Sequence, residues 1–267
     1  MVRALLLAAG LGTRLRPLTD EWPKCLMPVR GRPLLEYWLC TLRNSGISEI
    51  LVNKHWHADK VEDFLARERY TGWIRSVHEW RLLGTAGTLI ANASLFRGHT
   101  TLVIHADNWC QCDFSAFLRY HLSERPAHCA VTMMTFDTET PEDCGIVKTD
   151  NQGVVVAFYE KVANPPGRRA NAAVYMLEPE VVEWLEEHPE VSDFSTQVLP
   201  QYVGRIATWH NYGVHRDIGS LDSLRKAQSD VPTNCDFFER DEWQDRFEST
   251  PIFKTLNEFI FQPGARL

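Results

Sequence analysis

The chain has 267 residues, which is enough for one large α/β domain with a well-buried core, and no Ser/Gly/Pro-rich linker or block of charge divides it. Its 28 basic and 35 acidic residues leave a formal net charge of -7. This balance excludes the basic surface that is typical of nucleic-acid-binding proteins. Any phosphates that the protein binds are therefore expected to belong to small molecules.

Targeting and redox signals favour the cytoplasm. Met1-Val2-Arg3 is followed by only a short apolar run, so we expect neither a signal peptide nor a membrane partner. Seven scattered cysteines indicate reduced thiols. Cys110-Gln111-Cys112 and His55-Trp56-His57 lack a partner pair at metal-site spacing, so a zinc site is not favoured.

The first half of the chain alternates strands and helices. Residues 2–8 are predicted to form a strand, and Leu34, Leu35, Trp38, Leu39 and Leu42 share one face of a helix that Ser45-Gly46 ends. A strand over 49–53, a helix over 59–67 and strands over 73–79 and 101–106 follow. This order predicts an α/β, Rossmann-like, mostly parallel sheet with helices on both faces.

The second half changes character. Strands predicted over 129–136, 146–149, 154–159 and 172–177 have little helix between them, which indicates a partly antiparallel extension. Residues 1–228 are expected to form the main domain. Residues 229–267 carry Phe237-Phe238, Trp243, Phe247, Phe253 and Phe259-Ile260-Phe261, too apolar for a disordered tail. We expect this extension to pack on the domain or at a subunit interface, so a homo-oligomer is possible.

The end of the first strand is the strongest site signal. Residues 2–8 run into Ala9-Gly10-Leu11-Gly12-Thr13-Arg14, where backbone N–H groups can turn toward an anion and Arg14 can hold two phosphate oxygens. A dinucleotide-binding fingerprint would need a third glycine at Leu15 and an acid after a second strand, but Glu36 lies in a helical pattern. The loop instead suits a triphosphate whose pyrophosphate must leave.

Seven ordered blocks extend this signal along residues 2–228. They are Leu7–Thr19 with Pro23–Val29, Leu83-Gly84-Thr85-Ala86-Gly87, His105-Ala106-Asp107-Asn108, Cys144-Gly145-Ile146-Val147, Phe158-Tyr159-Glu160-Lys161 and Asp217-Ile218-Gly219-Ser220. This series resembles the sugar-1-phosphate nucleotidyltransferases, also called nucleotide-sugar pyrophosphorylases. The resemblance implies that a nucleoside triphosphate and a sugar 1-phosphate give a nucleoside diphosphate sugar and pyrophosphate.

The resemblance also implies roles for individual residues. Asp107 and Asp217 would bind Mg²⁺, which uses one or two carboxylates plus substrate phosphates. The bland alternatives are a turn cap for Asp107 and a helix N-cap before 221–227 for Asp217. The catalytic set would be Arg14, Lys24, Asp107 and Lys161, with Arg14 and Lys24 on the β and γ phosphates and Lys161 on the sugar phosphate.

Two groups of binding residues follow from the same resemblance. The nucleotide would contact Ala9, Gly10, Gly12, Thr13, Arg14, Lys24, Glu79, Gly84 and Thr85. The sugar would be bound on the antiparallel extension and nearby, by Asn108, Gly145, Glu160, Lys161 and Asn171. Val162 stands where relatives usually carry proline, and Ala173 stands where they carry glycine. These differences leave the identity of the sugar substrate open.

The block Leu83–Gly87 resembles mannose-1-phosphate and heptose-1-phosphate guanylyltransferases, which favours GTP with mannose 1-phosphate or a related manno-configured sugar, for polysaccharide synthesis. Glu79 could accept from the donor edge of guanine, whereas Arg81 stands where relatives often have an acid. A uridylyl- or thymidylyltransferase acting on glucose 1-phosphate is the alternative. Two further hypotheses remain. One is a catalytically silent nucleotide-sugar-binding regulatory subunit, which is disfavoured because the charged residues of the proposed site are all present: Arg14, Lys24, Asp107, Lys161 and Asp217. The other is a cytidylyltransferase that acts on a polyol phosphate or choline phosphate.

Overall fold

The computed structural model describes residues 1–231 and 239–261, with side chains described through residue 256. The chain divides into two compact units. The first comprises Met1–Leu6, Arg81–His105 and Cys112–His215, and the second Leu7–Trp80, Ala106–Gln111 and Arg216–Leu267. Each unit is therefore assembled from segments far apart in sequence.

The first unit is built on strands around one long central strand. β11 (Arg169–Leu177) pairs antiparallel with β6 (Thr100–His105), β8 (Val131–Asp137) and β9 (Gly145–Thr149). β10 (Val155–Glu160) runs antiparallel to β9, and β12 (Ile206–His210) runs parallel to β8. The side chains of Leu102, Ile104, Met133, Val174 and Met176 are fully buried. The predicted antiparallel extension is thus present.

The helices of the first unit are α4 (Thr85–Ala91), α5 (Phe114–Arg119) and α6 (Pro179–Glu187). Neither α5 nor α6 was predicted, because their few turns carry too short a periodic pattern. His121, just after α5, is fully buried and shares a hydrogen bond of 2.8 Å between its Nδ1 and Thr132 Oγ1. Burial and Arg125 lower the pKa of this histidine to about 3.

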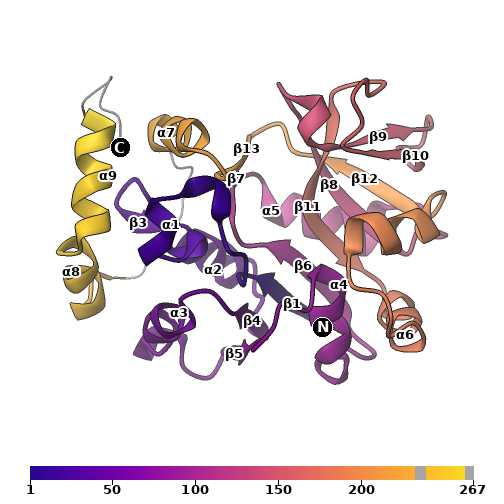
Figure 1. Ribbon diagram of the computed structural model, residues 1–267. Helices are drawn as coiled ribbons and strands as arrows, with labels where there is room; N and C mark the ends of the chain where they lie inside the picture. The colour runs from indigo at the N-terminus through magenta and orange to yellow at the C-terminus, as the bar shows by residue number, and fades with distance from the viewer. Residues whose placement is uncertain (232–238, 262–267) are drawn as a thin grey trace. The chain divides into compact units, whose positions relative to one another are not determined.

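The second unit contains the parallel pair β4 (Ile50–Lys54) and β5 (Ile74–His78), with α3 (Ala58–Leu65) connecting them. Figure 1 shows β4, β5 and α3 in purple. α2 (Leu34–Asn44) buries the leucines whose spacing predicted it and ends before Ser45-Gly46. The predicted strands and helices of residues 34–79 are therefore confirmed to within two residues at each end.

The remaining elements are short or lie near the C-terminus. They are α1 (Leu18–Glu21), the hairpin β2 (Pro28–Val29) and β3 (Arg32–Pro33), β7 (Asn108–Gln111), α7 (Leu221–Ser229), α8 (Glu242–Glu248) and α9 (Pro251–Phe261). β1 (Val2–Leu7) and β13 (Val214–Asp217) each have residues in both units. β7, β12 and β13 were not predicted. β1 ends one residue before the predicted Ala8, and Asp107 lies in the turn after β6.

The α/β class is confirmed, with a mostly parallel central sheet, helices around it and antiparallel strands. Within residues 1–231 and 239–261, no helix has both the length and the apolar character needed to cross a membrane. The predicted boundary near residue 228 stays a prediction. Of the apolar residues that motivated the predicted C-terminal extension, Phe237 and Phe238 lie outside the described residues, and so do the side chains of Phe259, Ile260 and Phe261.

Candidate functional site: two aspartates around a buried lysine

The glycine loop folds tightly onto the segment that follows it. Gly12 has a φ of +64°, and a Cβ at this position would lie 2.8 Å from Thr19 Cγ2 and 3.3 Å from Lys24 Cβ. Thr19 Oγ1 donates to the Gly12 carbonyl at 2.8 Å. Only glycine combines this backbone conformation with this close approach. Because residue 12 is glycine, the loop that carries Arg14 can pack against Lys24.

Lys24 lies at the centre of a charged cluster within the second unit. Its side chain is only 6% exposed, and its Nζ lies 2.7 Å from Asp107 Oδ2 and 2.6 Å from Asp217 Oδ1. Arg14 Nη2 lies 2.6 Å from Asp217 Oδ2, on a side chain that is 71% exposed. Four of the predicted site residues, separated by up to 203 positions, are therefore in direct contact.

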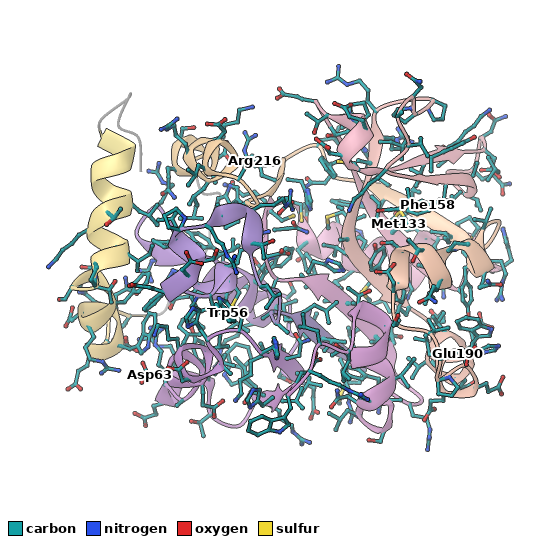
Figure 2. All side chains as sticks on the ribbon, viewed as in Figure 1. Trp56, Asp63, Met133, Phe158, Glu190 and Arg216 are labelled. Carbon is teal, nitrogen blue, oxygen red and sulfur yellow. The ribbon has the colours of Figure 1, made fainter. Side chains whose placement is uncertain are left out.

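A half-buried aspartate outside the predicted set, Asp230, contacts the neighbours of the two carboxylates. Asp230 accepts from the Trp109 indole at 3.0 Å and from Arg216 Nε and Nη2 at 2.7 and 3.0 Å. Arg216 precedes Asp217 directly, and Trp109 lies two residues after Asp107. Figure 2 labels Arg216 beside the start of α7. Asp230 thereby fixes the backbone next to both aspartates.

Asp217 is not the cap of the helix that follows it. The N-cap of α7 is Ser220, whose Oγ accepts from the Ser223 N–H at 3.1 Å. A Cβ at Gly219 would lie 2.6 Å from Arg14 Nη2 and 2.9 Å from Asp217 Oδ2. The capping alternative for Asp217 is therefore wrong, and Gly219 leaves the space that its ion pair with Arg14 occupies.

The electrostatics of the cluster follow from its mixed charge. Burial by itself would lower the pKa of the Lys24 ammonium, but Asp107 and Asp217 outweigh that effect and raise the pKa above its ordinary value. Burial would likewise raise the pKa of Asp217, but Lys24 and Arg14 outweigh it and lower the pKa. Lys24 and Asp217 are thus held in their charged forms at neutral pH.

The donor set fits a hard divalent cation that also binds substrate. Within residues 1–231 and 239–261, no three His, Cys, Asp or Glu side chains gather into a metal site. Asp107 and Asp217 offer carboxylate oxygens that converge on one point, now contacted by the Lys24 ammonium. Magnesium needs no more protein ligands than these, because it keeps several waters and binds substrate phosphates.

Glu79 is connected to the glycine loop through a residue that sequence reasoning missed. Asn53 Nδ2 donates to Glu79 Oε1 at 2.9 Å, and Asn53 Oδ1 accepts from the Ala8 N–H at 2.7 Å. Asn53 and Glu79 are 3% and 5% exposed. An amide side chain inside an otherwise apolar strand is the signal that could have identified Asn53. Ala9 lies next to this bridge and is buried.

Gly84 and Thr85 contact a segment of their own unit. The Ser192 carbonyl accepts from the Ala86 N–H at 2.9 Å, and the Phe194 N–H donates to Thr85 Oγ1 at 2.7 Å. A Cβ at Gly84, where φ is +81°, would lie 2.4 Å from the Ser192 carbonyl oxygen. Gly84 and Thr85, which are predicted to contact the nucleotide, therefore have a structural function: they hold residues 192–194 in place.

The expected sugar residues of the first unit gather at one end of β9 and β10. Gly145 is the register partner of Glu160, and a Cβ at Gly145 would lie 2.6 Å from Glu160 Oε2. Lys161 follows with a φ of +48°, and its Nζ lies 3.7 Å from Glu160 Oε1. Burial raises the pKa of Glu160, with Lys161 opposing and Asp193 adding to the shift.

Asn171 lies in β11, where the pairing with β8 is irregular between Asn171 and Tyr175. Its Nδ2 donates to the Tyr175 hydroxyl at 2.6 Å, and its Oδ1 accepts from the Ala173 N–H at 2.9 Å. Ala173 has a φ of +53°, the conformation that glycine adopts most easily. The alanine therefore occupies a glycine-like backbone position.

The other predicted contacts are dispersed over the second unit. Thr13 and Gly10 are exposed, and a Cβ at Gly10 would meet no atom within 4 Å. Asn108 begins β7 and is 6% exposed, and its backbone carbonyl accepts from the Trp38 indole at 2.9 Å. Their substrate roles stay predictions.

Known proteins are similar to this chain over most of its length. Residues 3–234 match the family model described as nucleotidyl transferase. The chain is 30% identical to a mannose-1-phosphate guanylyltransferase of Mycobacterium tuberculosis, over 86% of this chain and 64% of that protein. It is 29% identical to a UTP–glucose-1-phosphate uridylyltransferase of Synechocystis, over 76% of this chain and 55% of that protein.

The fold has a solved counterpart. A crystal structure from Bacillus anthracis, assigned as a glucose-1-phosphate thymidylyltransferase and containing a sucrose, superposes with a TM-score of 0.78 at 21% identity. It covers 88% of this chain and 98% of that one. The chain spans only 55–64% of the length of the two curated relatives described above.

Proposed function

Because this chain belongs to the nucleotidyl transferase family, with the motifs of its sugar-1-phosphate members, we propose that it joins a nucleoside triphosphate to a sugar 1-phosphate. The observation that carries the proposal is the Lys24 ammonium between the carboxylates of Asp107 and Asp217, with Arg14 beside them. A cluster of two cations and two strand-end acids suits the handling of phosphates and of a metal ion.

The proposed reaction is a single displacement at phosphorus. A phosphate oxygen of the sugar 1-phosphate attacks the α-phosphorus of the triphosphate, and the bond to the bridging oxygen of the β-phosphate breaks. That oxygen leaves with the electron pair as part of pyrophosphate. Such transfers need positioning and charge neutralisation more than a covalent intermediate, so no nucleophilic side chain is required.

Each charged residue has a function in this proposal. Arg14 and Lys24 neutralise the departing pyrophosphate, and Lys161 holds the sugar phosphate while Glu160 accepts from sugar hydroxyls. Asp107 and Asp217 would hold Mg²⁺, which supplies Lewis-acid neutralisation of phosphate charge when bound. Members of this family generally use a divalent metal, and the two carboxylates are the ligands that magnesium prefers.

For the substrates we propose GTP with mannose 1-phosphate or a close manno-configured sugar. The guanylyltransferase among the relatives and the carboxylate of Glu79 support this pair. A carboxylate can accept from both guanine N1–H and N2–H, whereas it would repel the N1 acceptor of adenine.

A pyrimidine nucleotide with glucose 1-phosphate is the second candidate. It is favoured by the uridylyltransferase among the relatives and by Glu79 itself, which is 5% exposed and already accepts from Asn53. Such burial would limit how much of the carboxylate a guanine could reach.

The decisive experiment measures pyrophosphate release from every common nucleoside triphosphate against a panel of sugar 1-phosphates, with Mg²⁺ present. GTP with mannose 1-phosphate should give the highest kcat/KM, and Asp107→Asn is the inactive control. Preference for UTP or dTTP would replace the base assignment, and no release with any pair would refute the reaction class. A cytoplasmic location and a homo-oligomer stay predictions.

A further inference from the structure

The C-terminal segment makes specific polar contacts with the rest of the second unit, to which it belongs. Asp241 caps α8 and accepts from Arg67 Nε and Nη2 at 2.8 and 3.0 Å. Trp243 donates to Asp63 Oδ2 at 2.7 Å and packs edge-on against Phe64 at 5.0 Å between ring centroids. Figure 2 labels Asp63 on α3, near the yellow helix α8. These contacts therefore fix the position of α8 against α3.

One residue of α8 reaches the segment that carries Lys24. Phe247 is 1% exposed, and its ring lies 5.7 Å from that of Trp22, between centroids. The Trp22 indole N–H donates to the Leu26 carbonyl at 3.0 Å. That carbonyl ends the 3-10 turn Lys24–Leu26, whose first residue is the lysine between the aspartates. Phe247 thus contacts Trp22, which precedes this turn in sequence and whose side chain donates to the last residue of the turn.

A second contact holds the other end of the same segment. Gln244, one turn before Phe247 and 4% exposed, donates from Nε2 to the Gly31 carbonyl at 2.9 Å. Residues 22–31 are therefore held at two points by α8.

We propose that α8 positions the lysine of the catalytic cluster, with Phe247 acting through Trp22 on the turn Lys24–Leu26. The kinetic consequences of this positioning rest on the proposed function. The physical reason is that a single 3-10 turn with no side-chain cap has few hydrogen bonds of its own, so its geometry depends on neighbours. Lys24 must reach two carboxylates within 2.7 Å, and small displacements of such groups are costly in catalysis.

The test compares Phe247→Ala with Arg246→Ala, a neighbour on α8 that is 61% exposed and pairs with Asp63 at the surface. Phe247→Ala should lower kcat about tenfold and raise the KM for the triphosphate, with the KM for the sugar 1-phosphate unchanged. Phe247→Leu should restore most of the loss, because it keeps apolar bulk against Trp22. Assays run well below the unfolding temperature of each variant, so loss of folded protein cannot imitate the result.

Two further measurements separate positioning from general destabilisation. In a Lys24→Ala background, Phe247→Ala should cause no additional loss of kcat, since both changes act through the same ammonium. The amides of Leu26 and Met27, which donate to Pro23 and Lys24 at 3.0 Å, should exchange faster in Phe247→Ala and not in Arg246→Ala.

The exchange measurement needs no turnover, so it tests the proposal even if the proposed reaction fails. Unchanged exchange at Leu26 and Met27 overturns the inference. Equal falls in kcat for Phe247→Ala with and without Lys24 overturn it as well. An inert wild-type protein with altered exchange in Phe247→Ala refutes the proposed function and keeps the positioning role of α8.

Discussion

Gly219 and Arg14 occupy adjoining space: a Cβ on residue 219 would lie 2.6 Å from the Arg14 Nη2 and 2.7 Å from its Cζ. Arg14 is an exposed, flexible side chain, so a methyl group would displace it rather than disrupt the core. A glycine at position 219 of the Asp-Ile-Gly-Ser block therefore leaves room for the Arg14 guanidinium, a steric role that sequence alone does not show.

Gly219→Ala tests this relationship. The methyl group should push the guanidinium away from Asp217, raising the KM for the triphosphate about tenfold while changing the unfolding temperature little. Gly167→Ala is the matched control, because a Cβ there meets no atom within 4 Å. A triphosphate KM equal to that of the control would contradict the assignment.

Asp107→Asn and Asp217→Asn should each lower kcat by about two orders of magnitude or more, because an amide is a poor ligand for Mg²⁺ and no longer offsets the Lys24 charge. The fold should remain intact, since both side chains are partly exposed, at 33% and 44%. Steady-state kinetics over a range of Mg²⁺ concentrations, with circular dichroism on each variant, checks both statements. Near-wild-type turnover in both variants would remove the aspartates from the metal site.

Arg14→Ala and Lys161→Ala should give different kinetic patterns. Loss of Arg14 should damage triphosphate use and leaving-group stabilisation, lowering kcat and kcat/KM for the triphosphate. Loss of Lys161, which is exposed, should mainly raise the KM for the sugar 1-phosphate. Varying each substrate at saturation of the other measures the split, and identical patterns would refute the two assignments.

Base preference should depend on the Asn53–Glu79 pair. Glu79→Gln should reduce the advantage of GTP over UTP about tenfold or more, because the amide replaces one acceptor with a donor. Asn53→Asp should have a similar effect, since it places a second buried acid 2.9 Å from Glu79 Oε1 and disturbs its charge. The ratio of kcat/KM values for GTP and UTP is the measurement, and an unchanged ratio in both variants would exclude Glu79 from base selection.

His121 should make the protein less stable in mild acid. Its folded pKa of about 3 lies below the unfolded value of about 6.5, so the unfolded chain binds the extra proton between these limits. Stability is therefore complete above about pH 6.5 and falls as the pH drops toward 3. Burial is the larger cause of this lowered pKa and the charge of Arg125 adds to it, while Glu178 Oε1 lies 3.2 Å from the His121 Nε2.

Between pH 7 and pH 5 this group should remove about 2 kcal/mol of unfolding free energy. His121→Gln keeps a hydrogen-bonding partner for Thr132 and should lack this component. Urea unfolding of both proteins at the two pH values measures the difference. Equal pH dependence in wild type and variant would show that another group is responsible.

Much of the fold and the membership of the nucleotidyl transferase family could be predicted from local pattern. The leucines on one face predict the helix 34–44, and the two glycines before Arg14 predict the phosphate-binding loop. Both features can be predicted because they depend on residues that are close in sequence. The resemblance likewise pointed to Arg14, Lys24, Asp107 and Asp217 as site residues one by one, and their roles stay predictions. It could not show that one lysine contacts both acids.

Contacts between distant segments were decided by tertiary structure alone. Asn53 lies between Ala8 and Glu79, and Asp230 between Trp109 and Arg216, at separations that no periodicity spans. Phe247 contacts Trp22 across 225 positions (247 minus 22) in the same way. Residue type and spacing determine which groups can take part in phosphate chemistry. The close packing of the folded core determines which of them meet, because hydrogen bonds and ring contacts depend on position in space.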